Sequence, residues 1–175
     1  MKKLVLALFI LATTFSYSQE NNQSAFPKNE IKGNALLLVA GAIEITYEHL
    51  LNEESGVGVS LFVAYSDDFD TNFALTPYYR YYFGKKPAAG FFVEGFGMLN
   101  SYTQPASDGD WFSNYEGPEK DITDFALGFG LGSKWITKKG FLFEINAGVG
   151  RNLFNSSDTD YEIVGRVGIT LGYRF

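Results

Sequence analysis

The last stretch of the sequence, Y-E-I-V-G-R-V-G-I-T-L-G-Y-R-F from Tyr161 to Phe175, decides the fold class. Alternate residues in it are apolar or aromatic, and Gly165 is the one gap in that series. The residues between them are mostly charged or small. A period of two predicts a β-strand with one apolar face, longer than most strands of soluble domains.

The same period of two recurs along the chain and predicts eight strands. Their expected ranges are 32–38, 42–50, 56–65, 73–83, 91–102, 122–137, 141–154 and 161–175. We expect a tight turn at Ala40 and Gly41, and a single bent strand through this region is the alternative. Pro77 has no amide donor, so we expect a β-bulge there. Short connections alternate with longer polar ones, which is typical of bacterial outer-membrane barrels.

The N-terminus has the pattern of a secretory signal peptide. Lys2 and Lys3 precede an apolar run, Leu4–Phe15, that is too short to span a bilayer, and small residues precede a cleavage point near Ser18. The expected organisation is a signal peptide, a flexible segment and one barrel domain, over 1–18, 19–31 and 32–175.

Composition narrows the choice of architecture and partner. The formal net charge of −6 argues against nucleic acid as a partner. The absence of cysteine excludes disulfides and thiolate metal sites. Residues are 46% hydrophobic, yet no later run is long enough for a transmembrane helix. Strand-forming residues and 19 glycines leave a soluble all-β barrel or sandwich, or a membrane β-barrel.

The polar faces of the strands separate these two candidates. They carry four acidic and four basic residues: Glu44, Glu48, Arg80, Glu94, Lys134, Glu144, Arg166 and Arg174. A water-facing exterior would carry more charge, so we place this face in the lumen and the apolar face towards lipid. Eight strands enclose just enough space for side chains, so we expect ion pairs there. A soluble lipocalin-like carrier with an apolar interior is the alternative.

Glycine alternates along one face of the sixth predicted strand. Gly128, Gly130 and Gly132 share this face, and we expect them to make room for long neighbouring side chains such as Tyr78 and Tyr82.

The single histidine, His49, is the starting point for an enzyme hypothesis. Its position in the second predicted strand puts it on the lipid-facing side with Tyr47, near the periplasmic end. No serine is placed to be activated beside it, although Ser133 stays open as a partner. We therefore expect a barrel that is not an enzyme and that has no cofactor and no metal centre.

The connections expected at the outer end are rich in acidic residues: Asp67, Asp68, Asp70, Asp108, Asp110, Glu116, Glu119, Asp121, Asp158 and Asp160. Asp68, Asp70 and Asn72 alternate in a way that suits a weak site for a hard cation such as calcium. This segment lacks the glycine and distal glutamate of a calcium loop, so the other interpretation is a solvated loop that holds divalent cations loosely. Trp111, Phe112 and Tyr115 suggest either a partner site or contact with the membrane surface.

The chain resembles the small outer-membrane β-barrels of the OmpA-transmembrane-domain and OmpX type. The resemblance rests on the signal peptide, the amphipathic strands, the N-A-L-L-L…Y-E-H-L opening (34–50) and the terminal G-Y-R-F (172–175). The spacing of Leu171, Tyr173 and Phe175 is similar to the signal that the barrel-assembly machinery reads. The resemblance implies an all-β, eight-stranded, antiparallel up-and-down transmembrane barrel in the outer membrane of a Gram-negative bacterium.

Three functions follow from this resemblance. The first is a monomeric, non-enzymatic barrel with a plugged lumen, which serves envelope structure or surface interaction beside lipid and lipopolysaccharide. The second is a narrow pore for ions or small solutes, and the third is a lipid-acting enzyme. Fold alone does not choose among them.

Overall fold

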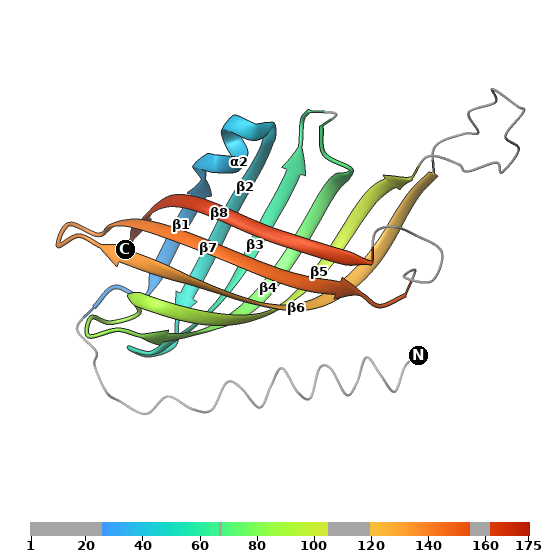
Figure 1. Ribbon diagram of the computed structural model, residues 1–175. Coiled ribbons are helices and arrows are strands. Elements are labelled where there is room, and N and C mark those ends of the chain that lie inside the picture. The colour runs from blue at the N-terminus through green and yellow to red at the C-terminus, as the bar shows by residue number, and fades with distance from the viewer. Residues whose placement is uncertain (1–25, 67, 105–119, 155–161) are drawn as a thin grey trace, which may run out of the picture.

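The protein forms one closed antiparallel barrel of eight strands, and the computed structural model describes residues 26–66, 68–104, 120–154 and 162–175. Each strand pairs with its neighbours in the sequence, and β8 closes the ring by pairing with β1 (Figure 1). The strands are β1 (Asn29–Asn34), β2 (Ala42–Leu50), β3 (Ser55–Ala64), β4 (Thr71–Phe83), β5 (Gly90–Gln104), β6 (Lys120–Ile136), β7 (Phe141–Asn152) and β8 (Ile163–Arg174). The predicted eight-stranded up-and-down architecture is confirmed.

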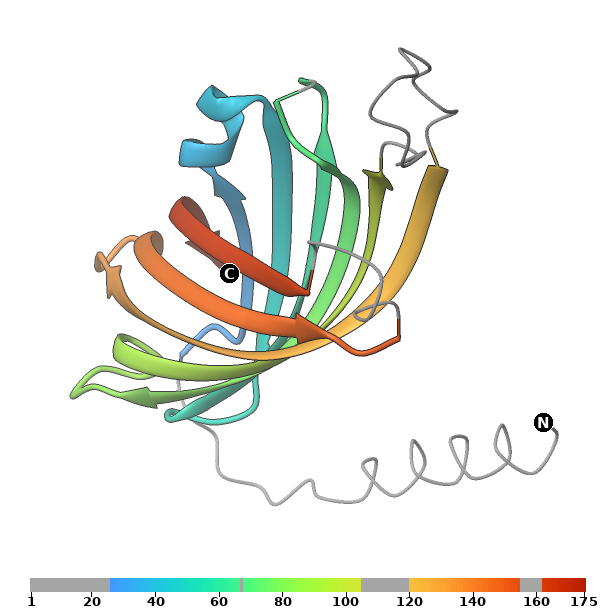
Figure 2. The same ribbon diagram turned by 45° about the vertical axis from the view of Figure 1, so that its right-hand side comes forward.

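The two ends of the barrel differ. The connections at 51–54, 84–89 and 137–140 lie at the same end as Asn29 and Phe175, and we call it the short-turn end. The helix α2 (Ala35–Ala40) and the connection between β3 and β4 lie at the other end, which we call the long-loop end (Figures 1 and 2). Within the described residues, no helix is long and apolar enough to cross a membrane.

The first hairpin departs from its prediction. β1 begins at Asn29, inside the segment expected to be flexible, and ends at Asn34 rather than at Leu38. Residues 35–40 form α2 because Asn34 caps its first turn and accepts a hydrogen bond from the Leu37 amide. Gly41 ends α2 with φ of 112°, a left-handed conformation that glycine adopts readily. The prediction that residues 35–38 continue the first strand is therefore wrong, whereas the predicted division of this region into two strands is correct.

The bulge predicted at Pro77 is also wrong. The register between β4 and β5 is the same at the Leu75–Leu99 pair and at Tyr78–Phe96, on either side of Pro77. Pro77 lies opposite Val59 on the outer face, so its missing donor interrupts the ladder without shifting it. The register shifts instead near the start of β4, between Thr71 and Phe73.

The outer face of the barrel is apolar and its centre is polar. Large side chains that alternate along the strands are exposed, including Val57, Val59, Leu61 and Val63 on β3. The residues between them point inwards, where charged side chains such as Arg80 and Lys134 are almost completely buried. This is the reverse of the apolar interior that a soluble lipocalin-like carrier requires.

Apolar clusters line the lumen on both sides of the charged centre. At the short-turn end Leu50, Tyr82, Ala88 and Phe92 pack together, and Phe26 covers them. The second cluster lies nearer the long-loop end and consists of Ala74, Tyr78, Phe96, Met98 and Ala126, with Phe62 and Val164 against it. The charged side chains are therefore shielded from both ends to different degrees.

The glycines of β6 accommodate rings from the neighbouring strand. A Cβ atom at Gly132 would lie 2.5 Å from Cζ of Phe92, and one at Gly128 would overlap the ring of Phe96. The ring of Tyr78 lies instead against Gly58 on β3. The expectation that these β6 glycines make room for bulky neighbours is therefore correct, but the neighbours are phenylalanines of β5 and not the two tyrosines of β4 given as examples.

Replacement of Gly132 by alanine should destabilise the barrel. Its new methyl group would press on Phe92 and on the backbone of β7, and overpacking of this kind costs about 1–3 kcal/mol. Gly95→Ala is the matched control, because no atom lies within 4 Å of a Cβ there. Urea unfolding of the refolded protein in lipid vesicles measures both variants. Equal stability of the two would contradict the close packing of β6.

Candidate functional site

Ten charged side chains meet inside the barrel and form the site, which we call the lumen network. Five are acidic and five basic: Glu30, Glu44, Glu48, Glu94, Glu144, Lys32, Arg80, Lys134, Arg166 and Arg174. All eight residues expected in the lumen belong to it, and Glu30 and Lys32 join them. Within the network the formal charges cancel.

The centre of the network surrounds Arg80. Its Nε donates to Oε2 of Glu94 at 2.7 Å, and its Nη1 donates to Oε2 of Glu144 at 2.8 Å. Lys32 approaches from β1, where its Nζ lies 3.2 Å from Oε2 of Glu144 and 2.5 Å from Oε2 of Glu48. Side chains from five strands thus meet across the middle of the barrel.

The part of the network towards the short-turn end ties down a connection between strands. Arg174 donates through Nε to Oε1 of Glu30 at 2.8 Å, and through its two terminal nitrogens to the carbonyls of Pro87 and Ala88, each at 2.8 Å. Lys134 donates to the other oxygen of Glu30 at 2.7 Å. The 84–89 turn is therefore held across this end of the lumen.

Arg166 forms the part nearest the long-loop end. Its Nη1 donates to Oε1 of Glu94 at 2.9 Å, while Nη2 contacts Oγ of Ser60 at 3.0 Å and Oε1 of Glu44 at 3.5 Å. Asn34 donates to the other oxygen of Glu44 at 2.7 Å. With Ser60 included, all eight strands contribute a side chain to the network.

Aromatic rings fill the space between the charges. The Arg80 guanidinium lies 4.4 Å from the ring centroid of Tyr78 and 4.2 Å from that of Phe92. Hydroxyls of Tyr78 and Tyr82 donate to the carboxylate of Glu48. Charges removed from water are tolerated when they are paired and hydrogen-bonded, and cation–π contacts add to their stabilisation.

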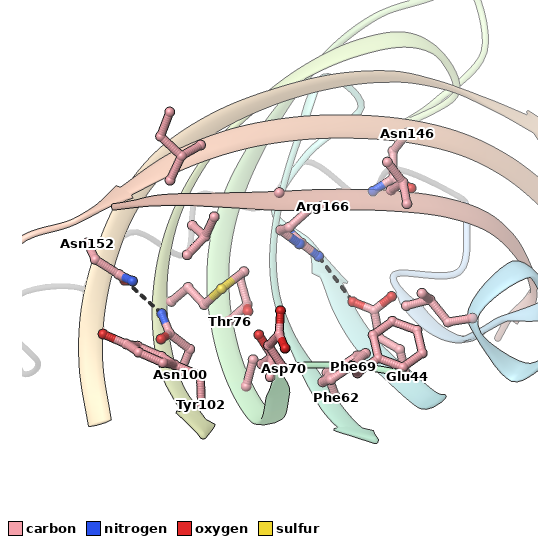
Figure 3. Close-up of a pocket in the computed structure, with 18 of the residues that line it drawn as sticks. Glu44, Phe62, Phe69, Asp70, Thr76, Asn100, Tyr102, Asn146, Asn152 and Arg166 are labelled. Atoms are coloured by element: carbon pink, nitrogen blue, oxygen red, sulfur yellow. Dashed lines mark hydrogen bonds and ion pairs between the residues drawn. The ribbon is translucent and has the colours of Figure 1, made fainter. Parts of the chain in front are cut away.

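A cavity of about 380 Å³ opens beyond Arg166 at the long-loop end (Figure 3). Its polar lining includes Glu44, Asp70, Asn100 and Asn146, and its apolar lining includes Phe62, Phe69, Met98 and Val164. Among the described residues, no three acidic, histidine or cysteine side chains are grouped closely enough to hold a metal ion.

The structure keeps His49 and Ser133 apart. They lie on the outer faces of β2 and β6, strands that are four positions apart in a ring of eight and so face each other across it. Nδ1 of His49 lies 2.9 Å from Oδ1 of Asn29. These two residues therefore cannot form a nucleophile and its base.

The proposed cation ligands are only partly together. Asp68 and Asp70 line the same cavity, and Oδ2 of Asp68 accepts a hydrogen bond from Ser66 at 2.8 Å. Asn72 is turned to β5, where its amide donates to Oγ1 of Thr103 at 2.8 Å. Several residues of the expected outer loops lie outside the described part of the chain: Asp67, Asp108, Asp110, Trp111, Phe112, Tyr115, Glu116, Glu119, Asp158 and Asp160.

The terminal aromatic series lies at the closing seam. Leu171, Tyr173 and Phe175 are all exposed on the outer face. The backbone of Phe175 exchanges two hydrogen bonds with Asn29, at 2.8 and 3.1 Å. The last residue of the chain therefore pairs with the first residue of β1.

Glu30 and Lys32 are the network residues that sequence reasoning missed. Pro27 and the polar composition around it suggested a flexible lead-in, so the strand was expected to start only at Lys32. The period of two does continue backwards, because Glu30, Lys32 and Asn34 alternate with less polar residues. This weak alternation was the available signal.

The fold is a small, closed, up-and-down β-barrel whose lumen is charged. The structure is similar to the crystal structure of the N-terminal β-barrel domain of Pseudomonas aeruginosa OprF, with a TM-score of 0.59 and 15% sequence identity. The match covers 85% of this chain and 96% of that one. The expected resemblance to small outer-membrane barrels is thereby confirmed at the level of fold.

The sequence matches the family described as "Protein of unknown function (DUF3575)" over residues 4–168, and the chain belongs to that family. A comparison with curated proteins gave no match.

Replacement of Arg80 by methionine should strongly destabilise the barrel. It would leave Glu48, Glu94 and Glu144 buried with fewer cations, and loss of one partner from a buried pair costs about 3–5 kcal/mol. Arg151→Met is the control, because the Arg151–Glu162 pair is exposed and such pairs contribute about 1 kcal/mol or less. Urea unfolding in lipid vesicles compares them, and similar losses would contradict the role of the lumen network.

Proposed function

We propose that this protein is a non-enzymatic, monomeric barrel of the Gram-negative outer membrane whose lumen is plugged by the lumen network. The observation that carries the proposal is the arrangement of the two faces. The large apolar side chains are exposed all round the barrel, while ten charged residues are paired inside it. In lipid a β-sheet must close on itself so that every backbone N–H and C=O group has a hydrogen-bond partner. The sheet of this protein is closed.

The plug is proposed from contacts that cross the lumen. Arg80 joins β4 to carboxylates on β5 and β7, and Arg174 joins β8 to the turn between β4 and β5. Phe26 and the apolar cluster around Phe92 add a further layer at the short-turn end. Eight strands enclose little more than their own side chains, so we expect these contacts to block the passage of water and ions.

We infer the orientation of the barrel in the membrane from its short-turn end. Both Asn29 and Phe175 lie at the short-turn end, and in outer-membrane barrels the short turns are periplasmic. The long-loop end would then face outwards, beside lipopolysaccharide. Its acidic residues, Asp68, Asp70 and Asp121 among them, support a role in envelope structure or surface interaction, with divalent cations as loosely held partners.

The refolded wild-type protein should show no steady single-channel conductance in a planar bilayer. Replacing Arg80 and Glu144 together by alanine removes one charge of each sign from the centre, and steady conductance is expected to appear. The same double replacement at the exposed Arg151–Glu162 pair is the control, and this variant should show no steady conductance. Steady conductance of the wild type would make a narrow pore the function instead.

The aromatic terminus is proposed to act in assembly rather than in stability. Phe175→Ala should lower the amount of protein in the outer-membrane fraction several-fold while leaving the urea midpoint of the refolded barrel nearly unchanged. Phe83→Ala is a matched control, because Phe83 is an equally exposed aromatic residue at the same end, 57% against 55% for Phe175. An equal decrease of both variants in the outer-membrane fraction would contradict the proposal that Phe175 is part of an assembly signal. Absence of the wild type from that fraction would overturn the outer-membrane location.

A further inference from the structure

A groove of about 800 Å³ runs over the outer face of the barrel at the closing seam, and we call it the seam groove. Its walls are exposed apolar side chains from five strands: Ile31, Ile45, Trp135, Phe143 and Leu171. Gly33 lies between Leu171 and Ile45 in the sheet, and no atom lies within 4 Å of the position that its Cβ would take. The missing side chain therefore leaves a notch in the apolar surface.

The seam groove adjoins a second pocket at the rim of the short-turn end, which we call the rim pocket. It has a volume of about 390 Å³. Ile136, Thr137 and Tyr173 line both the seam groove and the rim pocket. Phe26 and Phe175 add apolar surface to the rim pocket. A long apolar molecule on the wall of the barrel could thus place one end in the rim pocket.

The rim pocket is basic. Exposed lysines from two turns line it, Lys86 from the 84–89 turn and Lys138 and Lys139 from the 137–140 turn. No acidic side chain lines it. Arg174, which also lines it, is paired with Glu30, whereas the three lysines form no ion pair with any described residue. Three positive charges are therefore left for an anion at this rim.

We propose that the seam groove and the rim pocket together bind one anionic phospholipid. An acyl chain would lie in the notch at Gly33, and the phosphate would lie at Lys86, Lys138 and Lys139. The inference rests on the proposed membrane location, which puts the short turns at a membrane–water interface. Aromatic side chains and lysines at such an interface contact lipid headgroups, and basic pockets there bind anionic ones.

The two adjoining sites select this ligand over simpler ones. A free phosphate ion would use the lysines and leave the apolar groove empty. A lipid without net charge would use the groove and leave the lysines unpaired. Only a molecule with an apolar chain and an anionic head uses both, and burial of the chain and pairing of the charge then add to its affinity.

The test adds lipid to the mature protein refolded in detergent micelles, and native mass spectrometry measures the lipid bound to each barrel. The probes are dioleoylphosphatidylglycerol and dioleoylphosphatidylcholine, which have the same chains and differ in net charge. We expect one phosphatidylglycerol per barrel, bound about tenfold more tightly than phosphatidylcholine, and a smaller difference as the salt concentration is raised. Glycerol 3-phosphate, which has the charge without the chains, should not displace the lipid at equal concentration.

One pair of variants tests the headgroup site. Lys86→Gln should weaken phosphatidylglycerol binding about fivefold and leave phosphatidylcholine binding unchanged, because it removes one charge from the rim pocket. Lys85→Gln is the matched control, since Lys85 is an exposed lysine of the same turn that does not line the rim pocket. Replacing Lys86, Lys138 and Lys139 together by glutamine should abolish the preference for the anionic lipid.

A second pair of variants tests the chain site. Gly33→Leu fills the notch and should weaken the binding of both lipids about fivefold. Gly95→Leu is the matched control, because Gly95 is also exposed with no atom within 4 Å of its Cβ position, but lies outside the seam groove. Heat-dependent mobility on gels reports whether each variant is folded, and the lysine variants decide the outcome if Gly33→Leu does not fold.

Several results would overturn the inference. These are equal affinity of the wild type for the two lipids, equal effects of Lys86→Gln and Lys85→Gln, and displacement of the lipid by glycerol 3-phosphate. A dimer of barrels that Gly33→Leu dissociates would also overturn it, in favour of a contact between two copies. A barrel that inserts into vesicles without a lipid preference would refute this site alone, whereas a folded protein that stays out of vesicles would refute the proposed membrane location as well.

Discussion

Pairing of β8 with β1 is the constraint on which the rest of the structure depends. It joins Asn29 to Phe175 by reciprocal backbone hydrogen bonds and leaves no strand edge unpaired among the described residues. An open sheet would expose a row of unpaired donors and acceptors, which lipid cannot satisfy. Closure also creates an inside that is separated from solvent, and every inward side chain must be accommodated there.

The narrow interior explains the residue types that fill it. Charged side chains in this space need partners, and five acids and five bases supply them for one another. Large rings such as Phe92 and Phe96 need room, and glycines of β6 opposite them supply it. Charge pairing and the matching of large to small residues are thus two responses to the same limited volume.

The two ends of the lumen differ in the residues that close them. Arg174 holds the 84–89 turn across the short-turn end, and Phe26 covers the cluster beside it. At the long-loop end the network stops at Arg166, and a cavity with unpaired amide oxygens follows. The lumen is therefore closed by ion pairs at the short-turn end and leads into a cavity at the long-loop end.

The sequence by itself determined the architecture and the inward face, because a period of two assigns each side chain to a face without knowledge of its partners. Eight network residues were predicted in this way, whereas Glu30 and Lys32 were missed because their strand is short and follows a polar segment. Only the tertiary structure decided which acid meets which base, that His49 and Ser133 lie on opposite walls, and that Asn100 and Asn146 share a cavity. These facts depend on register and on the curvature of the closed sheet, which bring together residues from distant strands and leave no local signal in the sequence.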